Sequence, residues 1–560
     1  MSGRSVSAFD QYLSAYTVFT MDKRELLNEL HTNKSALFQI RINDNLSWTF
    51  DMVVNDMRAP SFRQVVVTDE GEFECNNFVL NTFKGETSDG RVARFTIDEN
   101  TFFGVILGEN YHYMIRSARD YTRNADDRRF IVYKSWDVIA TEREFDFIND
   151  ALIVSSDGGN EIASHALDTP PPCAYILRIA TDADFEFYQL HGSNTNNHIR
   201  SILNMVEGVY QSAFGMRFMI TFQAVVNRPN HLYTSTNAGT LLNEFRNYWN
   251  ANRRSVERNI AHLFTNKNLN YLGYAFVGQI NGNANNNWAY ALSGHVNHSN
   301  RLHEIVAHEI GHNLNAGHPS TNTCGCDDFF DRSIMCPQLS IFPSTNLWFC
   351  QQSRIEINMF IRANRRYLIT VCGHMAVCNS GIFTINIPGG HHHHVTWGVT
   401  PANLFSVSPA TGNWTNVTVL NPGWAHQGVL TATVRNVIGD VVMTKTIMDF
   451  CEPPICDCPP DGDCTCDRPW NFIFTPHPNP VSDVLIIDLT PREADVFRTR
   501  ISAETAFNIR LLNAHGIVVR QQRTQASTIQ FDVSQLPEGT YYLHIEHGGE
   551  IEKHQIIVWR

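Results

Sequence analysis

His308-Glu309-Ile310-Gly311-His312 is the stretch that decides the fold, because it places two imidazoles and a carboxylate within one apolar segment. The surrounding apolar residues recur at helical spacing and predict a helix with one face toward a core: Leu302, Ile305, Val306, Ile310 and Leu314. On such a helix His308 and His312 project from the same side, one turn apart, and can share one metal ion. Glu309 points away from that pair, which suits a carboxylate that handles water instead of binding the metal.

A third histidine, His318, follows His312 after a short interval in which the chain must turn sharply. Asn315 and Gly317 can supply that turn, because Asn and Gly tolerate left-handed backbone angles at a helix end. Three neutral imidazoles leave the fourth zinc position open for water, as in a catalytic site. The alternative is a helix with scattered surface histidines, but the third histidine and a downstream methionine argue against coincidence.

The stretch resembles the metzincin metallopeptidases, whose extended pattern is HExxHxxGxxH followed by a methionine turn. Residues 333–337, Ser-Ile-Met-Cys-Pro, look like that turn. The resemblance implies that zinc is bound by His308, His312 and His318, that Glu309 is the catalytic residue, and that Met335 lies beneath the metal.

Within the metzincins, the sequence of residues 308–314 looks more like that of the adamalysins, or reprolysins. The same holds for four nearby cysteines, Cys324, Cys326, Cys336 and Cys350. Three departures stand out. Asn315 replaces the usual Gly, Pro319 follows the third histidine as in serralysins where adamalysins have Asp, and no Tyr follows Met335 as it does in serralysins.

Length, composition and charge bound the class of protein. At 560 residues the chain is too long for one core, and roughly three to five domains are expected. The formal charge of -13 argues against a nucleic-acid partner. We expect a soluble protein without a membrane span, because no apolar run is long enough.

The cysteines and the N-terminal sequence give conflicting indications of the compartment in which the protein folds. Thirteen cysteines, clustered after the zinc motif and in one later segment, indicate disulfides formed outside the cytoplasm. The sequence nevertheless starts with Met1-Ser2-Gly3-Arg4 and no signal peptide. The two observations agree if a signal has been removed.

Residues 1–168 alternate apolar and polar positions over short runs and predict a β-rich domain. Its runs 82–86 and 103–106 are similar to those of reprolysin-type propeptides. A plain accessory β-domain stays open as the alternative. Pro170-Pro171-Pro172 then marks a boundary, because consecutive prolines hold an extended chain.

Residues 173–370 alternate strands and helices and predict an α/β catalytic domain. We expect strands at 174–180, 216–226, 274–278 and 288–293, and helices at 198–214 and within 241–264, ahead of the zinc helix. The metzincin resemblance implies that the strand at 289–292 borders the cleft, where an extended peptide can add.

The remaining sequence predicts two β-sandwich domains. Residues 371–450 have short strands and turns and suggest an Ig-like sandwich, with His391 to His394 in an exposed hairpin more readily than in a metal site. Residues 451–470 form a linker rich in Pro, Asp and Cys, whose CxC spacing favours disulfides over a zinc ribbon.

Residues 471–560 carry several ordered motifs that look like the C-terminal sorting domain of the type IX secretion system: Asn513-Ala514-His515-Gly516, the run 536–543 and the run 555–558. The resemblance implies a secreted or surface-attached protein and the type IX secretion machinery as a partner. The fold class is therefore a multidomain chain, with a metzincin-like α/β catalytic domain between a β-rich N-terminal domain and two C-terminal β-sandwich domains.

The sequence favours a secreted zinc endopeptidase that cleaves protein or peptide substrates. The alternative is a surface adhesion or binding protein whose zinc domain is only a scaffold. An intact Glu309 beside intact ligands disfavours that alternative.

A latent precursor needs its open zinc position blocked, and a thiolate is a strong zinc ligand. Only Cys75 and Cys173 lie upstream of the catalytic helices, so both are candidates. Two alternatives stay open: Cys173 can close a disulfide within the catalytic domain, or an upstream Asp can be the blocking ligand.

Overall fold

The computed structural model describes three stretches of the chain, residues 9–139, 173–449 and 472–558. Within them the description excludes these short segments: 44–45, 76–78, 88–90, 99–100, 109–110, 123–124, 230, 281–287, 295–300, 320–323, 327–331, 338–346, 373–375, 378–379, 389–393, 421–425, 437–438, 478–480, 482, 492–506, 514–517, 525–527, 538 and 548–549. The predicted boundary at Pro170–Pro172, the histidines 391–393 and the linker 451–470 lie outside the described residues.

The chain divides into two compact units. One comprises Met1–Cys372, Thr384–Thr396 and Ala432–Met443. The other comprises Gly373–Phe383, Trp397–Thr431 and Thr444–Arg560. The protein is therefore multidomain, as predicted.

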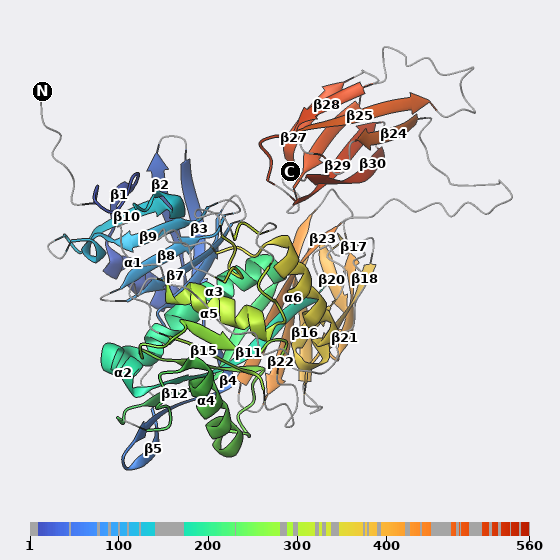
Figure 1. Ribbon diagram of the computed structural model, residues 1–560. Coiled ribbons are helices and arrows are strands. Elements are labelled where there is room, and N and C mark those ends of the chain that lie inside the picture. The colour runs from blue at the N-terminus through green and yellow to red at the C-terminus, as the bar shows by residue number, and fades with distance from the viewer. Residues whose placement is uncertain are drawn as a thin grey trace, which may run out of the picture. The chain divides into compact units, whose positions relative to one another are not determined.

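The N-terminal part of the first unit is an antiparallel β half-barrel (Figure 1). Its eight strands follow the order β1-β10-β9-β8-β7-β6-β3-β2. Their bounds are β1 Thr17–Thr20, β2 Ser35–Asn43, β3 Leu46–Val54, β6 Thr82–Glu86, β7 Val92–Ile97, β8 Phe102–Ile106, β9 Tyr113–Ser117 and β10 Arg129–Lys134. Short 3-10 turns η1 (Ala118–Asp120) and η2 (Ser135–Asp137) follow β9 and β10. This sheet confirms the predicted β-rich fold.

Helix α1 (Lys23–Asn33) covers one face of the half-barrel. It begins after Asp22, whose carboxylate accepts hydrogen bonds from the first free backbone N–H groups, of Arg24 and Glu25. Leu30 on the helix and Phe50 on β3 belong to one buried apolar cluster. The period-two alternation of the strands supplies the other members of this core.

The catalytic region is built on a second, mixed sheet. In space its strands follow the order β14-β15-β13-β11-β12-β4-β5. Their bounds are β11 Cys173–Ala183, β12 Met216–Val226, β13 Ile260–Phe264, β14 Gly273–Ala275, β15 Tyr290–Ser293, β4 Arg58–Thr68 and β5 Gly71–Glu74. Strands β15, β13, β11, β12 and β4 run parallel, whereas β14 and β5 at the two ends run antiparallel to their neighbours. Alternating strands and helices confirm the predicted α/β class.

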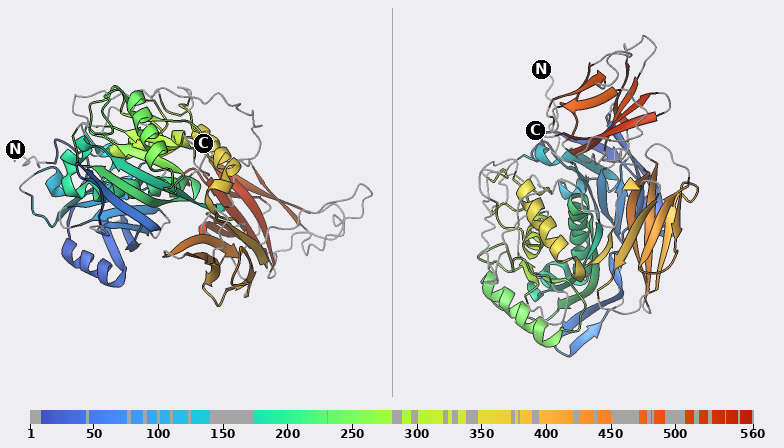
Figure 2. Two further views of the ribbon diagram at one scale, coloured as in Figure 1. Left: turned by 90° about the horizontal axis from the view of Figure 1, so that it is seen from below. Right: turned by 90° about the vertical axis from the view of Figure 1, so that its right-hand side faces the viewer.

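Two strands of this sheet come from the N-terminal region. Strand β4 pairs in parallel with β12, from Ile220↔Arg58 to Val226↔Val67. Figures 1 and 2 show this blue hairpin continuing the green sheet, away from the other blue strands. The sequence predicted strands in this region but gave no indication that β4 and β5 extend the sheet of residues 173–293.

Five α-helices accompany the sheet: α2 Phe185–His191, α3 Thr195–Phe214, α4 Ala238–Asn252, α5 Leu302–Asn313 and α6 Gln351–Ala363. The helical stretch expected within 241–264 is confirmed as α4, which begins at Ala238 and ends at Asn252, and β13 follows at Ile260–Phe264. All five residues of β13 are buried, as expected of a strand in the interior of a parallel sheet.

A disulfide closes the ends of the catalytic region. After the turn η4 (Arg365–Tyr367), strand β16 (Ile369–Cys372) pairs antiparallel with the start of β11. Cys173 and Cys372 face each other in this register and are bonded. The outer side of β16 pairs with residues 384–386 of β18 (Ser380–Asn386).

The rest of the chain forms small β-sheets. Its strands are β17 Ala376–Val377, β19 His394–Thr400, β20 Phe405–Ser408, β21 Trp414–Val419, β22 Gln427–Asn436, β23 Gly439–Asp449, β24 Phe472–His477, β25 Val484–Pro491, β26 Phe507–Leu512, β27 Val518–Thr524, β28 Thr528–Asp532, β29 Gly539–His547 and β30 Glu550–Val558. In the last segment one sheet has the order β24-β25-β28 and the other β27-β26-β29-β30. Leu485, Ile509 and Leu543 belong to the apolar core of this segment.

The buried histidine His262 predicts acid sensitivity. It lies on β13 with no exposed surface, and burial lowers its pKa to about 3 from an ordinary 6.5. Below pH 6.5 the unfolded chain therefore binds more protons than the folded chain, and the stability that neutral His262 contributes is lost as the pH falls toward 3. We expect the denaturant concentration at the unfolding midpoint of the first unit to decrease as the pH is lowered from 7 to about 4.

The variant His262→Gln tests this expectation in chemical denaturation at several pH values. It should flatten the pH dependence, because Gln does not titrate. The matched variant His394→Gln changes an exposed histidine and should leave the dependence unchanged. Equal slopes in all three proteins would show that His262 has no such role.

Candidate metal centre

Helix α5 carries the first two histidines of the predicted site, and each of its twelve residues is buried. Burial on all sides means that each polar side chain needs a partner inside the protein. The Tyr210 hydroxyl on α3 donates a hydrogen bond of 2.8 Å to the Ala307 carbonyl in the middle of α5. This contact fixes α5 against α3.

The end of α5 reverses the chain and brings the third histidine back. Asn315 takes the left-handed conformation, with φ 74°. The N–H of Asn315 donates to the His312 carbonyl, and the N–H of Ala316 donates to the Gly311 carbonyl. The prediction for Asn315 is confirmed. The prediction for Gly317 is wrong, because its φ is not positive and no other atom crowds its Cα.

The turn brings the three imidazoles to one place. His308, His312 and His318 each offer a nitrogen, and these three atoms lie within 4.8 Å of one another. The Nε2 atoms of His308 and His318 are 3.2 Å apart. His308 and His312 are buried and His318 is partly exposed, so this group opens toward solvent on the side of His318.

Hydrogen bonds orient two of the rings. His308 Nδ1 lies 2.7 Å from the Ile334 carbonyl oxygen, and His312 Nδ1 lies 2.7 Å from the Ala316 carbonyl oxygen. A carbonyl oxygen only accepts, so each Nδ1 donates, and in the neutral rings each Nε2 keeps its lone pair. Both Nε2 atoms therefore have the lone pair that a metal ligand needs.

The donor set fits a zinc ion. Two nitrogens bound at about 2.0–2.1 Å to one tetrahedral zinc lie roughly 3.3 Å apart. The 3.2 Å between Nε2 of His308 and of His318 agrees with that separation. Neutral imidazoles are ordinary zinc ligands.

Glu309 lies against the edge strand of the catalytic sheet. Its side chain is fully buried, and a Cβ added to Gly273 on β14 would lie 2.0 Å from Glu309 Oε1. The edge strand is therefore β14 and not the predicted strand at 289–292, because β15 pairs with β13 on its other side.

Met335 packs against Gly311 of α5. It is fully buried, and a Cβ added to Gly311 would lie 2.4 Å from its sulfur. The preceding Ile334 donates its N–H to the Trp348 carbonyl. The same residue accepts the hydrogen bond from His308, so the methionine turn also orients a ring.

Sequence reasoning missed Asn313, which ties α5 to the sheet edge. Its buried amide donates to the Phe276 carbonyl at 2.9 Å and to the Tyr290 carbonyl at 3.1 Å. Its place directly after the second histidine was the only available signal. Tyr210 and Gly273 were missed as well, because both are far from the motif in sequence.

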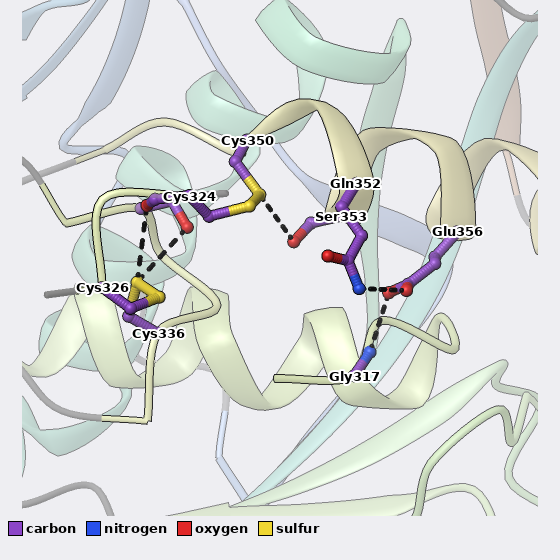
Figure 3. Close-up of a disulfide and its surroundings, with 9 residues drawn as sticks. Gly317, Cys324, Cys326, Cys336, Cys350, Gln352, Ser353 and Glu356 are labelled. Atoms are coloured by element: carbon purple, nitrogen blue, oxygen red, sulfur yellow. Dashed lines mark hydrogen bonds between the residues drawn. A yellow bond between two sulfur atoms is a disulfide. The ribbon is translucent and has the colours of Figure 1, made fainter. Parts of the chain in front are cut away.

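Disulfides and helix α6 fix the surroundings of the third histidine. Cys324 is bonded to Cys350 and Cys326 to Cys336. Figure 3 shows both bonds and, on α6, the Glu356 carboxylate, which accepts hydrogen bonds from the Gly317 N–H at 2.9 Å and from the Gln352 amide at 3.0 Å. Gly317 precedes His318, so Glu356 anchors the loop that positions this ring.

The two cysteines predicted to hold the precursor latent are not placed for that role. Cys173 is bonded to Cys372, so its sulfur is not a thiol, as the disulfide alternative anticipated. Cys75 is a free thiol directly after β5, at the opposite end of the sheet from β14. Six strand spacings of about 4.8 Å separate β5 from β14.

Comparison with known families identifies the catalytic region. Residues 174–349 match the reprolysin-like Metallo-peptidase family M12. The chain carries an M12 metallopeptidase domain. Residues 476–559 match the Secretion system C-terminal sorting domain. The M12 domain is therefore part of a protein exported by type IX secretion, to the medium or to the cell surface.

Two solved structures are similar to the chain that carries the M12 domain. Metalloproteinase-II from Bacteroides fragilis has 13% sequence identity and a TM-score of 0.35, and the match covers 61% of this chain and 96% of that chain. A chain from a chaperone-substrate complex has 14% identity and a TM-score of 0.27, with 35% and 36% covered. No curated protein matches the sequence. In the described part of the chain, no helix has the length and apolarity needed to cross a membrane.

The closeness of Gly273 to Glu309 predicts a catalytic defect. In Gly273→Ala the new methyl group meets the carboxylate and displaces either Glu309 or β14, because 2.0 Å is far below van der Waals contact. A displacement of about 1 Å at a reacting group costs about a hundredfold in rate. We expect kcat to fall by about that factor while the bound metal, measured by mass spectrometry, stays the same.

The control is Gly239→Ala on α4, where the nearest atom would lie at an ordinary 3.5 Å. It should keep its activity. Undiminished turnover in Gly273→Ala would mean that Glu309 tolerates the methyl group.

Proposed function

We propose that this protein is a secreted zinc-dependent endopeptidase. The observation that carries the proposal is the group of three imidazole nitrogens within 4.8 Å of one another, two on α5 and one on the loop after it. Glu309 of the same helix lies against the edge strand β14. The M12 domain supports peptide-bond hydrolysis as the reaction. The sorting domain supports a substrate outside the cell, and we propose that the secretion machinery recognises residues 476–559.

His308, His312 and His318 would hold the zinc ion. The Nδ1 hydrogen bonds of the first two rings support this assignment, because they direct Nε2 toward the shared point. When bound, zinc would polarise the scissile carbonyl and lower the pKa of water. In this proposal Met335 contributes only packing beneath the site.

Glu309 is the proposed general base and general acid. It takes the proton of the attacking water and later delivers a proton to the leaving amine. Its position one residue after His308 keeps it beside the ligands without binding the metal. Its fully buried side chain favours tight proton transfer over exchange with bulk solvent.

The substrate binds in this proposal as an extended peptide along β14. Among the described strands, β14 is the last of the sheet at this end, which is where a further strand can be added. An added strand places a peptide bond near Glu309, since β14 itself touches this residue. Main-chain pairing of this kind suits cleavage within a polypeptide.

The variant Glu309→Gln tests the mechanism. Gln has nearly the same shape as Glu but no basic oxygen, so we expect the zinc content to stay and peptidase activity to fall by at least about a hundredfold. Metal analysis and hydrolysis of a denatured protein substrate measure the two quantities. Comparable turnover in wild type and variant would remove Glu309 from the mechanism, and a wild type that holds zinc without hydrolysing protein would favour the scaffold of an adhesion protein.

We also propose that the protein is made as a latent precursor. The support is a contact between the half-barrel and the surroundings of the metal site. The Leu347 N–H donates to His112 Nε2 at 3.0 Å. The next residue, Trp348, accepts from Ile334, and Ile334 in turn holds His308. The N-terminal region can thus influence the site while it is continuous with β11.

A cleavage experiment tests latency. A recognition sequence for a specific protease is placed between residues 140 and 172, and peptidase activity is measured before and after the cut. The cut frees the end of the N-terminal region from β11, so that the contact of His112 with Leu347 can shift even while the two fragments stay together, and we expect at least a tenfold rise. An uncut protein as active as the cut protein would contradict latency and leave the zinc mechanism untouched.

A further inference from the structure

The N-terminal region is joined to the M12 domain by an extensive buried interface. Strand β4 lies beside β12, and Val65 and Val67 share an apolar cluster with Phe222 and Trp249. The face of β4 that carries Val65 and Val67 is buried, and the strand lies between β12 and β5 within the sheet. Without β4, the edge of β12 and this apolar surface would be exposed to water.

A buried carboxylate of the M12 domain has partners on both sides of the interface, because the N–H of Phe218 and the Arg217 side chain of β12 are joined by donors from the N-terminal region. Glu207 on α3 has no exposed surface. It accepts hydrogen bonds from Asn55 Nδ2 at 2.6 Å and from Arg94 Nε at 3.2 Å, and both donors belong to the N-terminal region. Burial alone raises the pKa of Glu207, but Arg94, Arg217 and Lys84 together hold it below its ordinary value.

The polar contacts continue along α3. Asn204, one turn before Glu207, accepts from Asn55 at 2.8 Å and donates to the Phe95 carbonyl of β7 at 3.0 Å. A helix of the M12 domain thus hydrogen-bonds to the backbone of the half-barrel. Removal of the N-terminal region would take Asn55 and Phe95 from Asn204, and Asn55 and Arg94 from Glu207. Of its described partners, Glu207 would keep only the Phe218 N–H and Arg217, and each lost partner of a buried group costs stability.

A third contact joins strand β5 of the N-terminal region to the end of α4. Glu72 on β5 binds Arg253 at the end of α4 through two hydrogen bonds of 3.2 and 2.9 Å. The Arg253 guanidinium also lies over the Phe222 ring, 4.6 Å from its centroid. The hairpin β4–β5 is therefore held by apolar, backbone and ionic contacts together.

From these contacts we infer that the N-terminal region stays bound to the peptidase permanently, even after the chain is cut, and does not leave on activation. After cleavage between residues 139 and 173, the fragment with β1–β10 stays bound to the fragment with the M12 domain. The M12 domain needs β4, Arg94 and Asn55 to keep its fold. The inference concerns association and does not require peptidase activity, so it can fail independently of the proposed function.

The experiment uses the full chain with a specific protease site between residues 140 and 172, in the Glu309→Gln background to prevent self-cleavage. After cutting, size-exclusion chromatography and denaturing gels follow the two fragments. We expect both to elute in one peak, with an unchanged thermal transition. Elution of the N-terminal fragment alone, with a remaining fragment that stays monomeric and folded, would overturn the inference.

Two variants test whether the buried ion pair of Arg94 and Glu207 holds the two fragments together. Arg94→Met leaves the Glu207 carboxylate without its main counter-ion, and we expect the fragments to dissociate at least about a hundredfold more readily. The double variant Arg94→Met, Glu207→Leu removes both charges and should recover much of the association. The control Arg63→Met removes an exposed ion pair with Glu74 on the same hairpin and should change nothing. Equal dissociation in all the variants would show that the buried charge does not hold the subunits together.

Discussion

The structure depends on the complete burial of α5. A helix that carries three imidazole- or carboxylate-bearing residues in its last two turns, with no exposed face, needs a protein partner for each polar group. The carbonyls of Ile334 and Ala316 receive the two ring N–H groups, and Tyr210 reaches the helix backbone. Because these partners come from the methionine turn, the loop after the helix and α3, the burial of one helix fixes most of the catalytic region.

The sequence predicted the parts of the site that are local. His308 and His312 follow from helical spacing, and Asn315 follows from the need for a left-handed residue at the helix end. The role predicted for Gly317 was wrong, because the single left-handed residue Asn315 is enough to reverse the chain. The Gly317 N–H instead donates a hydrogen bond to Glu356. A carboxylate on α6, with no motif around it, gives no sign in the sequence that it anchors this loop.

The errors in the fold are errors of long-range pairing. The pattern at 274–278 and at 288–293 predicted two strands, but not which of them is at the edge, since both are short and apolar. Strand β4 alternates like its neighbours in the half-barrel, so nothing local indicates that it pairs with β12, more than a hundred residues away. Strand existence follows from periodicity, whereas neighbours depend on the packing of the whole unit.

The bond between Cys173 and Cys372 also determines how the molecule carries mechanical load. It joins the first residue of β11 to the last residue of β16 across a sequence separation of 199. Tension applied between the chain before β11 and the chain after β16 passes through two sulfur atoms and bypasses the sheet and the metal site. A force that pulls on the two flanking segments therefore does not stretch the fold between them.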